Sequence, residues 1–428
     1  MQRGPLQTDV LIAGGGPAGL AAAIAARQKG LRVTVAEFAC PPVDKACGEG
    51  LMPEGVRALC ALGISISDGF PIRGIRFLAD DESVCADFPA GTGLAVRRTT
   101  LYNALAERAL DSGVSVLWGA RVEAHGGETA LVNGEPARCS WLVGADGMSS
   151  RIRAEAGLDA GKCSRARFGF RRHFKVEPWT DYVEVHWGPT SQLFVTPVGA
   201  QEVCIALLAR KPRPRLAEEI PSFAEVAWRL KGMMPSSIER GAVTFNRRLR
   251  AVTRGRVALV GDASGSVDAI TGEGLSVAFQ QALALAEAFA KDDLALYQAT
   301  HSRIMRVPAL MAKLLVIMDR HSWLRRQALH RLAARPGVFS RFLALHTSAL
   351  PPSVTLCNGA SRCAPPVSLP TQGLLPSDSI RQNHGDEYPS SLLPYFDTSL
   401  FVDALSVITQ LKLNGCRRSF RRGPRDPW

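Results

Sequence analysis

The sequence has no long hydrophobic run, no paired cysteines at metal-ligand spacing and few aromatic residues. No apolar stretch approaches the roughly 20 residues that a membrane-spanning helix needs, so we expect no transmembrane segment. The ten cysteines include no CxxC pair, which argues against a zinc site and a disulfide framework. We therefore expect free thiols, no bound metal and a cytoplasmic location. The first residues run directly into a strand-like segment, so we expect no signal peptide.

Acidic residues are also in the minority. The chain has 51 Lys and Arg against 39 Asp and Glu, a net charge of +12. Residues 294–346 hold nine Lys or Arg against the single acid Asp319. No nucleic-acid-binding motif accompanies this charge, so we expect no nucleic acid partner. Apolar residues accompany the basic ones, and the 294–346 helices are therefore a candidate for peripheral contact with a membrane surface. Residues 347–428 hold many prolines and no sustained period, which predicts a disordered tail.

The first motif that carries chemistry is Gly14-Gly15-Gly16-Pro17-Ala18-Gly19, a GxGxxG sequence between a predicted strand and a predicted helix. Gly14 permits a tight turn, Gly16 lets the backbone approach a pyrophosphate, and Gly19 lets the helix pack closely on the strand. Pro17 and Ala18 begin the helix, whose N-terminal amides attract phosphate. Glu37 ends the next predicted strand, where a carboxylate can accept the hydroxyls of an adenosine ribose. This segment predicts a dinucleotide site.

Two further segments place acids just beyond predicted strands. Asp146 and Gly147 follow the apolar strand ending near Gly144, and Gly261 and Asp262 follow the strand 256–260. Ligands of open α/β sheets bind at such strand ends. Asp262 is a candidate for hydrogen bonds to a ribityl chain. Gly272, Glu273 and Gly274 open a predicted helix whose amides can face a flavin ring.

These three segments together resemble the p-hydroxybenzoate hydroxylase superfamily of FAD enzymes. That superfamily combines the dinucleotide fingerprint with a GADGxxSxhR segment and a GDA segment, which stand here at 14–19, 144–153 and 261–263. The resemblance covers roughly residues 8–290 and implies bound FAD. It also implies that Arg98 lies near the FAD phosphates.

The fold class expected from these patterns is α/β (α+β overall). The FAD-binding domain, with a Rossmann-like fold, would comprise residues 6–75, 94–160 and 246–292. Alternating β-rich stretches in 165–210 predict a separate antiparallel sheet, so a substrate domain would comprise 76–93 and 161–245. Basic C-terminal helices would fill 293–346.

Within the superfamily, Lys45–Pro53 is similar to the CGGGL-like loop of geranylgeranyl reductases, and Gly265–Leu275 resembles a second stretch of theirs. Aromatic hydroxylases more often carry a histidine at the position of Gly265. The substrate motif of the reductases, PxxYxWxFPxG, is only partly kept. Its frame survives as Pro189, Pro197 and Gly199, but Gln192, Phe194 and Thr196 occupy the aromatic positions.

Cys47 and Glu49 in this loop are the candidate catalytic residues, either as proton donors or, for Cys47, as a gate. His173 and His186 are interpreted as structural histidines of the sheet.

The resemblance implies reduction of a carbon–carbon double bond in a hydrophobic substrate. The alternative is aromatic monooxygenation through a C4a-hydroperoxyflavin, and a third hypothesis is a non-catalytic flavin-binding protein. Only one dinucleotide fingerprint is present, so NADH or NADPH, or a redox partner, would reduce the flavin without a second Rossmann domain. The expected substrate is a hydrophobic or aromatic small molecule.

Overall fold

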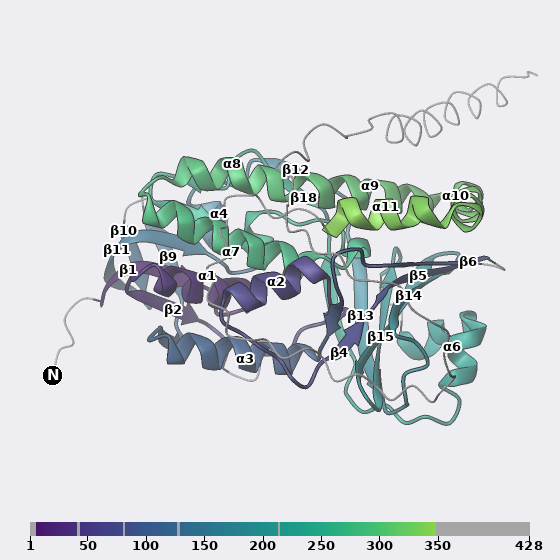
Figure 1. Cartoon of the computed structure of the whole chain (residues 1–428). Coiled ribbons are helices and arrows are strands. Elements are labelled where there is room, and N and C mark those ends of the chain that lie inside the picture. The colour runs from purple at the N-terminus through teal and green to yellow at the C-terminus, as the bar shows by residue number, and fades with distance from the viewer. Residues whose placement is uncertain (1–5, 41–42, 80–81, 126–128, 213–214, 348–428) are drawn as a thin grey trace, which may run out of the picture. The chain divides into compact units, whose positions relative to one another are not determined.

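The computed structural model describes residues 6–40, 43–79, 82–125, 129–212 and 215–347 (Figure 1). The predicted disordered tail lies outside these residues, apart from Thr347, which ends the last helix. Within the described residues, no helix combines the length and the hydrophobicity needed to cross a bilayer.

The first sheet is built around a parallel core. Its strands lie in the order β19 (Thr253–Arg254), β20 (Val257–Leu259), β11 (Glu135–Gly144), β1 (Leu6–Ala13), β2 (Val33–Glu37) and β8 (Ser115–Trp118). The hairpin β9 (Val122–His125) and β10 (Thr129–Val132) continues from β11. Strands β20, β11, β1, β2 and β8 run parallel to one another, whereas β19 and β10 pair antiparallel with β20 and β11. The centre of β1 is buried on both faces, as its continuous apolar run predicts.

Helices cover this sheet and supply most of its core. They are α1 (Pro17–Gln28), α2 (Pro53–Ala61), α3 (Arg98–Asp111), α4 (Arg151–Glu155), α7 (Gly274–Ala290) and α8 (Leu294–Ile304). In α3, Leu101, Leu105 and Ala109 lie on one face and belong to the core.

The second sheet is antiparallel except at one pair. Its order is β17 (Arg240–Thr244), β13 (Arg167–Phe174), β16 (Glu202–Ala209), β15 (Ser191–Gly199), β14 (Tyr182–Trp187), β5 (Gly74–Ala79) and β6 (Glu82–Asp87). Only β14 and β5 run parallel. Short strands connect the two sheets: β3 (Gly50–Leu51), β7 (Gly93–Ala95) and β4 (Phe70–Ile72) form one group, and β12 (Gly161–Cys163) pairs with β18 (Arg247–Leu249).

Both faces of the second sheet are covered. Alternate residues of β16 point to opposite faces of the sheet and belong to different hydrophobic cores. Cys204 and Leu208 lie in one core, and Val203, Ile205 and Leu207 lie in the other. The first side packs against the C-terminal helices α9 (Arg306–Arg320), α10 (Ser322–Ala334) and α11 (Pro336–Thr347). The other packs against α5 (Leu216–Glu219), the 3₁₀ turn Ile220–Ser222 and α6 (Ala224–Arg229). Figure 1 shows α9 to α11 on the opposite side of this sheet from α6.

The expected fold class, an α/β FAD-binding arrangement with an antiparallel second sheet and C-terminal helices, is confirmed. The domain boundaries given above stay a prediction.

Candidate functional site

The glycine-rich turn joins β1 to α1 with almost no space for side chains. Gly14 has φ +109°, and a Cβ there would lie 2.5 Å from the carbonyl oxygen of Ala145. A Cβ at Gly19 would lie 1.9 Å from the carbonyl oxygen of Gly14. Gly16 is the N-cap of α1 and Pro17 is its first residue, whereas a Cβ at Gly16 would meet nothing within 4 Å. The turn is therefore closely packed at Gly14 and Gly19, whereas the N-terminus of α1 at Gly16 is open, as a phosphate site requires.

Glu37 lies at the end of β2, directly beside this turn. Its Oε2 accepts a hydrogen bond of 2.5 Å from the amide of Gly15, and its Oε1 accepts one of 2.8 Å from the amide of Ala39. These two hydrogen bonds hold the Glu37 carboxylate next to the glycines. Ala18 is the second residue of α1.

Asp146 and Asp262 both follow parallel strands, β11 and β20, as predicted. Asp146 Oδ2 accepts the amide protons of Arg151 and Ile152 at the start of α4, while its Oδ1 is buried without a partner. Gly147 has nothing within 4 Å of an added Cβ. Gly261 and Asp262 begin a 3₁₀ turn after β20.

The Asp262 side chain is accessible, yet protein surrounds its carboxyl group on most sides. Removal from bulk water raises the pKa of this carboxyl, and the positive charges of Arg98 and Lys45 act in the opposite direction. Arg98 is the first residue of α3, and its Nε is buried without a partner. An inward-facing acid and an arginine therefore lie within electrostatic reach of each other.

Gly272, Glu273 and Gly274 lead into α7 as predicted. Neither glycine has an atom within 4 Å of an added Cβ, so the backbone is accessible there. Glu273 is buried, and burial raises the pKa of its carboxyl well above the usual range, with the charge of Glu54 adding to the effect. Burial also raises the pKa of Glu54 to about 7. The sequence analysis did not single out Glu54, which lies in the first turn of α2, where a carboxylate complements the helix dipole.

These residues fit FAD. The open glycine backbone at the start of α1 suits the pyrophosphate, Glu37 suits the adenosine ribose, and Asp262 suits the ribityl hydroxyls. The unpartnered Nε of Arg98 and the open backbone at Gly272–Gly274 are consistent with a ligand that completes this surface.

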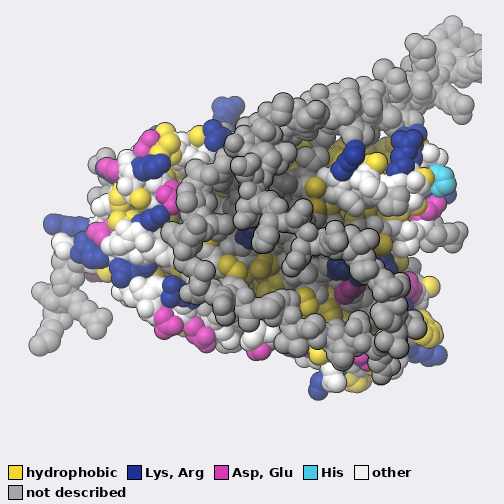
Figure 2. Space-filling view, in the orientation of Figure 1, with side chains coloured by type: hydrophobic (Ala, Val, Ile, Leu, Met, Phe, Trp, Pro, Cys, Tyr) yellow, Lys and Arg dark blue, Asp and Glu magenta, His cyan; other side chains and the backbone are white. Residues whose placement is uncertain are grey.

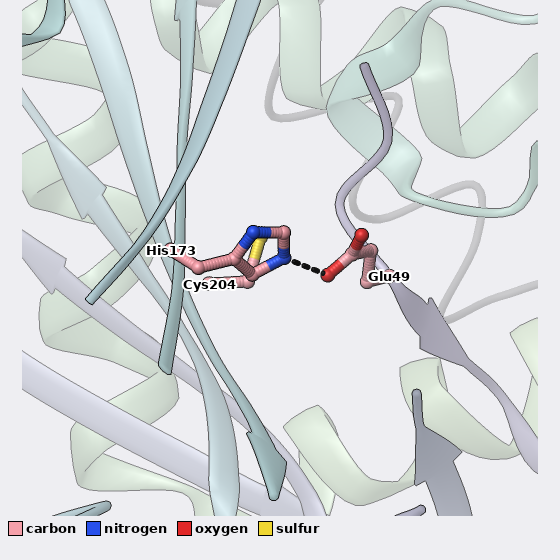
Figure 3. Close-up of side chains that lie close together, drawn as sticks. All are labelled: Glu49, His173 and Cys204. Carbon is pink, nitrogen blue, oxygen red and sulfur yellow. Dashed lines mark hydrogen bonds and ion pairs between the residues drawn. The ribbon is translucent and has the colours of Figure 1, made fainter. Parts of the chain in front are cut away.

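Glu49 is the centre of a buried polar cluster (Figure 3). Its φ is +63°, which is rare for a residue with a side chain, and this position of the CGGGL-like loop is normally glycine. The whole residue is only 2% exposed. Oε1 accepts the amide proton of Arg98 at 2.9 Å, and Oε2 lies 2.6 Å from His173 Nε2. The strained backbone thus delivers a carboxylate to the interior.

His173 and Arg171 of β13 in the second sheet contact Glu49. Nδ1 of His173 faces the Ser237 hydroxyl at 2.8 Å and guanidinium nitrogens of Arg97 and Arg171 at 3.4 Å. Because a guanidinium only donates, Nδ1 accepts, and Nε2 donates its proton to Glu49. Arg171 Nε lies 3.7 Å from Glu49 Oε1, and Arg171 also pairs with Asp44. His173 is buried and hydrogen-bonded at both ring nitrogens, as a structural histidine of the sheet would be, and one of its partners is the candidate catalytic residue Glu49.

A signal for this cluster was present in the sequence. Arg167, Arg171 and His173 lie an even number of residues apart on one strand, so they share a face, and all three are buried. Ionisable side chains are rarely buried without partners. Their spacing therefore indicates a polar interior, but it does not name the partners.

Cys47 and Cys204 lie beside the cluster. The Cys47 Sγ accepts a hydrogen bond from the Glu49 amide at 3.4 Å, and the Cys204 thiol donates to the Cys47 carbonyl at 3.9 Å. Burial raises the pKa of the Cys204 thiol well above its usual range, and the negative charge of Glu49 adds to this. Ligand atoms of Glu49, His173 and Cys204 lie within 4.8 Å of one another, but the adjacent guanidinium groups supply the positive charge there, which disfavours a cation.

A second buried network ties the C-terminal helices to the loop before α7. Arg167 pairs with Asp268 at 3.1 Å and with Asp319 at 3.3 Å. Gln192 accepts from Arg167 and donates to Asp319 at 3.1 Å. Gln192 occupies an aromatic position of the reductase motif, and here its amide belongs to this network.

The comparisons with known proteins agree with this geometry. The profile of the family described as "FAD binding domain" matches residues 7–292. The chain is 27% identical over 317 residues to menaquinone reductase of Mycobacterium tuberculosis, covering 67% of this chain and 78% of the relative. It is 26% identical over 306 residues to digeranylgeranylglycerophospholipid reductase 2 of Methanothermobacter thermautotrophicus, covering 64% and 75%.

Monooxygenases are similar too. 3-Hydroxybenzoate 6-hydroxylase of Polaromonas naphthalenivorans is 26% identical over 330 residues, covering 67% of this chain and 80% of the relative. Among solved structures, the flavin-dependent brominase Bmp2 superposes with a TM-score of 0.70 at 19% identity, covering 80% of this chain and 94% of that one. This last likeness concerns the fold.

Proposed function

The chain belongs to the FAD-binding-domain family of flavin-dependent oxidoreductases, and we propose that it reduces a carbon–carbon double bond of a hydrophobic, prenyl-containing substrate. Family membership argues against the non-catalytic hypothesis. The reductase relatives support the proposal, because one of them is named for a geranylgeranyl lipid.

The observation that carries the proposal is the anchored Cys47 loop. Glu49 replaces a glycine of the CGGGL-like loop, and its carboxylate fastens the loop to His173 and to the start of α3. Gly265 adds support: its φ is +111° and a Cβ would lie 2.8 Å from the Arg247 carbonyl, so the histidine common in hydroxylases would be strained here.

Bound FAD, once reduced by NADH, NADPH or a redox partner, would supply the hydride. The residues assigned to hold it are Gly14, Gly16, Pro17, Ala18, Gly19, Glu37, Arg98, Asp146, Gly147, Gly261, Asp262, Gly272, Glu273 and Gly274. Cys47 would give the proton from its Sγ to the second carbon of the double bond. Glu49, hydrogen-bonded to His173, would fix the loop so that this thiol faces the substrate.

The test is an anaerobic reaction of FAD-loaded, chemically reduced protein with a prenylated quinone and with a geranylgeranyl lipid. After any quinol has been reoxidised to the quinone in air, we expect mass spectrometry to show the gain of two hydrogen atoms in the prenyl chain. Cys47→Ala should slow this reaction while its flavin content stays unchanged, and Cys60→Ala, at an exposed cysteine, is the matched control. No saturated product from either substrate, with full flavin loading, would contradict the proposal.

The second candidate is aromatic monooxygenation. It is favoured by the similarity to 3-hydroxybenzoate 6-hydroxylase and by Gln192 and Thr196 standing where the reductase motif has aromatic residues. In air with NADH or NADPH, a phenolic product that has gained one oxygen atom from O₂ would select this candidate.

A further inference from the structure

Exposed apolar side chains gather in one segment of the second sheet. Trp228, Met233, Met234, Ile238 and Val243 are 72%, 41%, 77%, 62% and 52% exposed. They supply half of the large hydrophobic residues that are exposed among the described residues, within a stretch of only 16. Such a concentration marks an interaction surface. We refer to residues 228–243 as the docking segment.

Helix α6 presents the first of these residues outward. Val226 and Leu230 lie in the core against the second sheet, and Trp228 points to the opposite side of the helix. Arg229 lies over the Trp228 ring with 5.9 Å between guanidinium carbon and ring centroid. Figure 2 shows hydrophobic and basic side chains next to each other along the edge where Figure 1 has α6.

Backbone contacts attach the rest of the docking segment to the second sheet. Pro235 forms a bridge with Phe174, and the amide of Ser236 donates to the His173 carbonyl at 2.9 Å. Val243 lies on β17, the edge strand, paired with Phe168 of β13. Because Ser237 also contacts the His173 ring, the docking segment is attached to the residue that holds Glu49.

Basic residues accompany these apolar side chains. The docking segment carries Arg229, Lys231 and Arg240 and the acid Glu239; Arg229 pairs with Glu225 and Arg240 pairs with Asp44. A tryptophan, methionines and isoleucine beside basic residues are the composition of surfaces that enter the headgroup region of anionic bilayers.

The basic C-terminal helices are the competing surface, but their apolar residues are largely used inside the protein. Leu315 and Leu329 are buried against the second sheet, and Val316, Met318 and Leu332 pack against the same core. Of the large apolar residues on α8 and α10, Leu296 and Trp323 are exposed, and they lie on separate helices.

We propose that the docking segment 228–243 binds the surface of an anionic lipid bilayer. The choice of a bilayer over a second protein copy rests on the proposed function, since a prenyl lipid resides in the membrane and has to be taken from it.

The test measures co-sedimentation of the full chain, loaded with FAD, with phosphatidylcholine vesicles with and without phosphatidylglycerol. We expect binding that needs phosphatidylglycerol, weakens with salt, and falls about tenfold or more in the triple variant Trp228→Ser, Met234→Ser, Ile238→Ser. The matched control is Leu296→Ser with Trp323→Ser, which should bind within about twofold of the unmodified protein. Retained flavin absorbance shows that each variant is folded.

Three results would overturn the inference: no vesicle binding by the unmodified protein, loss of binding in the control pair but not in the triple variant, or an oligomer that only the triple variant disrupts. The activity of the triple variant on detergent-solubilised substrate separates the two proposals. Full activity there with lost vesicle binding supports both, whereas vesicle binding without any activity contradicts only the proposed function.

Discussion

Glu49 and His173 form a buried hydrogen bond, with 2.6 Å between Oε2 and Nε2, across the boundary between the Cys47 loop and the second sheet. Both side chains are 1% exposed. The bond makes the position of the loop depend on a strand more than a hundred residues away.

Replacing His173 by alanine should destabilise the protein by about 3 kcal/mol, because it leaves the buried Glu49 carboxylate without one of its donors. Glu49 keeps its contacts with Arg171 and with the Arg98 amide, so the loss of stability should be smaller than the largest losses known for breaking a buried ion pair. Urea unfolding measures this change. His330→Ala, at an exposed histidine that contacts Glu82, should change stability by less than about 0.5 kcal/mol. Equal effects of the two substitutions would contradict the prediction.

The Gly14→Ala variant should lose bound FAD. The added Cβ would lie 2.5 Å from the Ala145 carbonyl oxygen, and φ of +109° is unfavourable for alanine. The ratio of flavin to protein absorbance after purification measures retention, and we expect it to fall at least about tenfold. Gly134→Ala is the control, since Gly134 also has a positive φ but open surroundings. Loss of flavin in that variant too would mean that general backbone strain is the cause.

Replacing Glu54 by glutamine should stabilise the protein at high pH. The folded pKa of about 7 lies above the ordinary glutamate pKa of 4.5, so the folded state keeps a proton that the unfolded state releases. Stability from this group is therefore full below about pH 4.5 and is lost as pH rises through 7. The glutamine variant should be more stable by up to about 3 kcal/mol at pH 8 and show little gain at pH 4.

Unfolding of both proteins by urea across this pH range is the measurement. Glu107→Gln, at an exposed glutamate of α3, should shift stability by less than about 0.5 kcal/mol at either pH. A gain from Glu54→Gln that is the same at pH 4 and pH 8 would show that burial of the charge is not its origin.

Arg167→Met should destabilise by about 3–5 kcal/mol, because Asp268 and Asp319 would lose their shared buried partner. Burial already raises the pKa of the Asp319 carboxyl. Since Asp319 lies on α9 and Asp268 precedes the loop to α7, limited proteolysis should also cut more readily between α8 and α9. Arg320→Met, next to Asp319 but exposed, should leave both readouts unchanged; faster cleavage in that variant would contradict the role of the pair.

Much of the cofactor region was predictable because its signals are local. A strand, a glycine turn and a helix start follow one another within a few residues at 8–28, and acids follow strands at Asp146 and Asp262. Neighbouring backbone atoms leave no space for a side chain at Gly14 or Gly19, so the short motif is enough to predict the turn. The basic helices and the antiparallel sheet were likewise visible as periodic patterns.

The sequence by itself determined the FAD-binding fold and where its glycines and acids lie along the chain, since each of these is visible as a short local pattern of strand, turn and helix start. Only the tertiary structure decided that Glu49 meets His173, that Arg167 joins Asp268 to Asp319, and that Glu54 lies within electrostatic reach of Glu273. These partners come from segments far apart in the chain, and burial of a charge selects its partner through three-dimensional packing that no local pattern specifies.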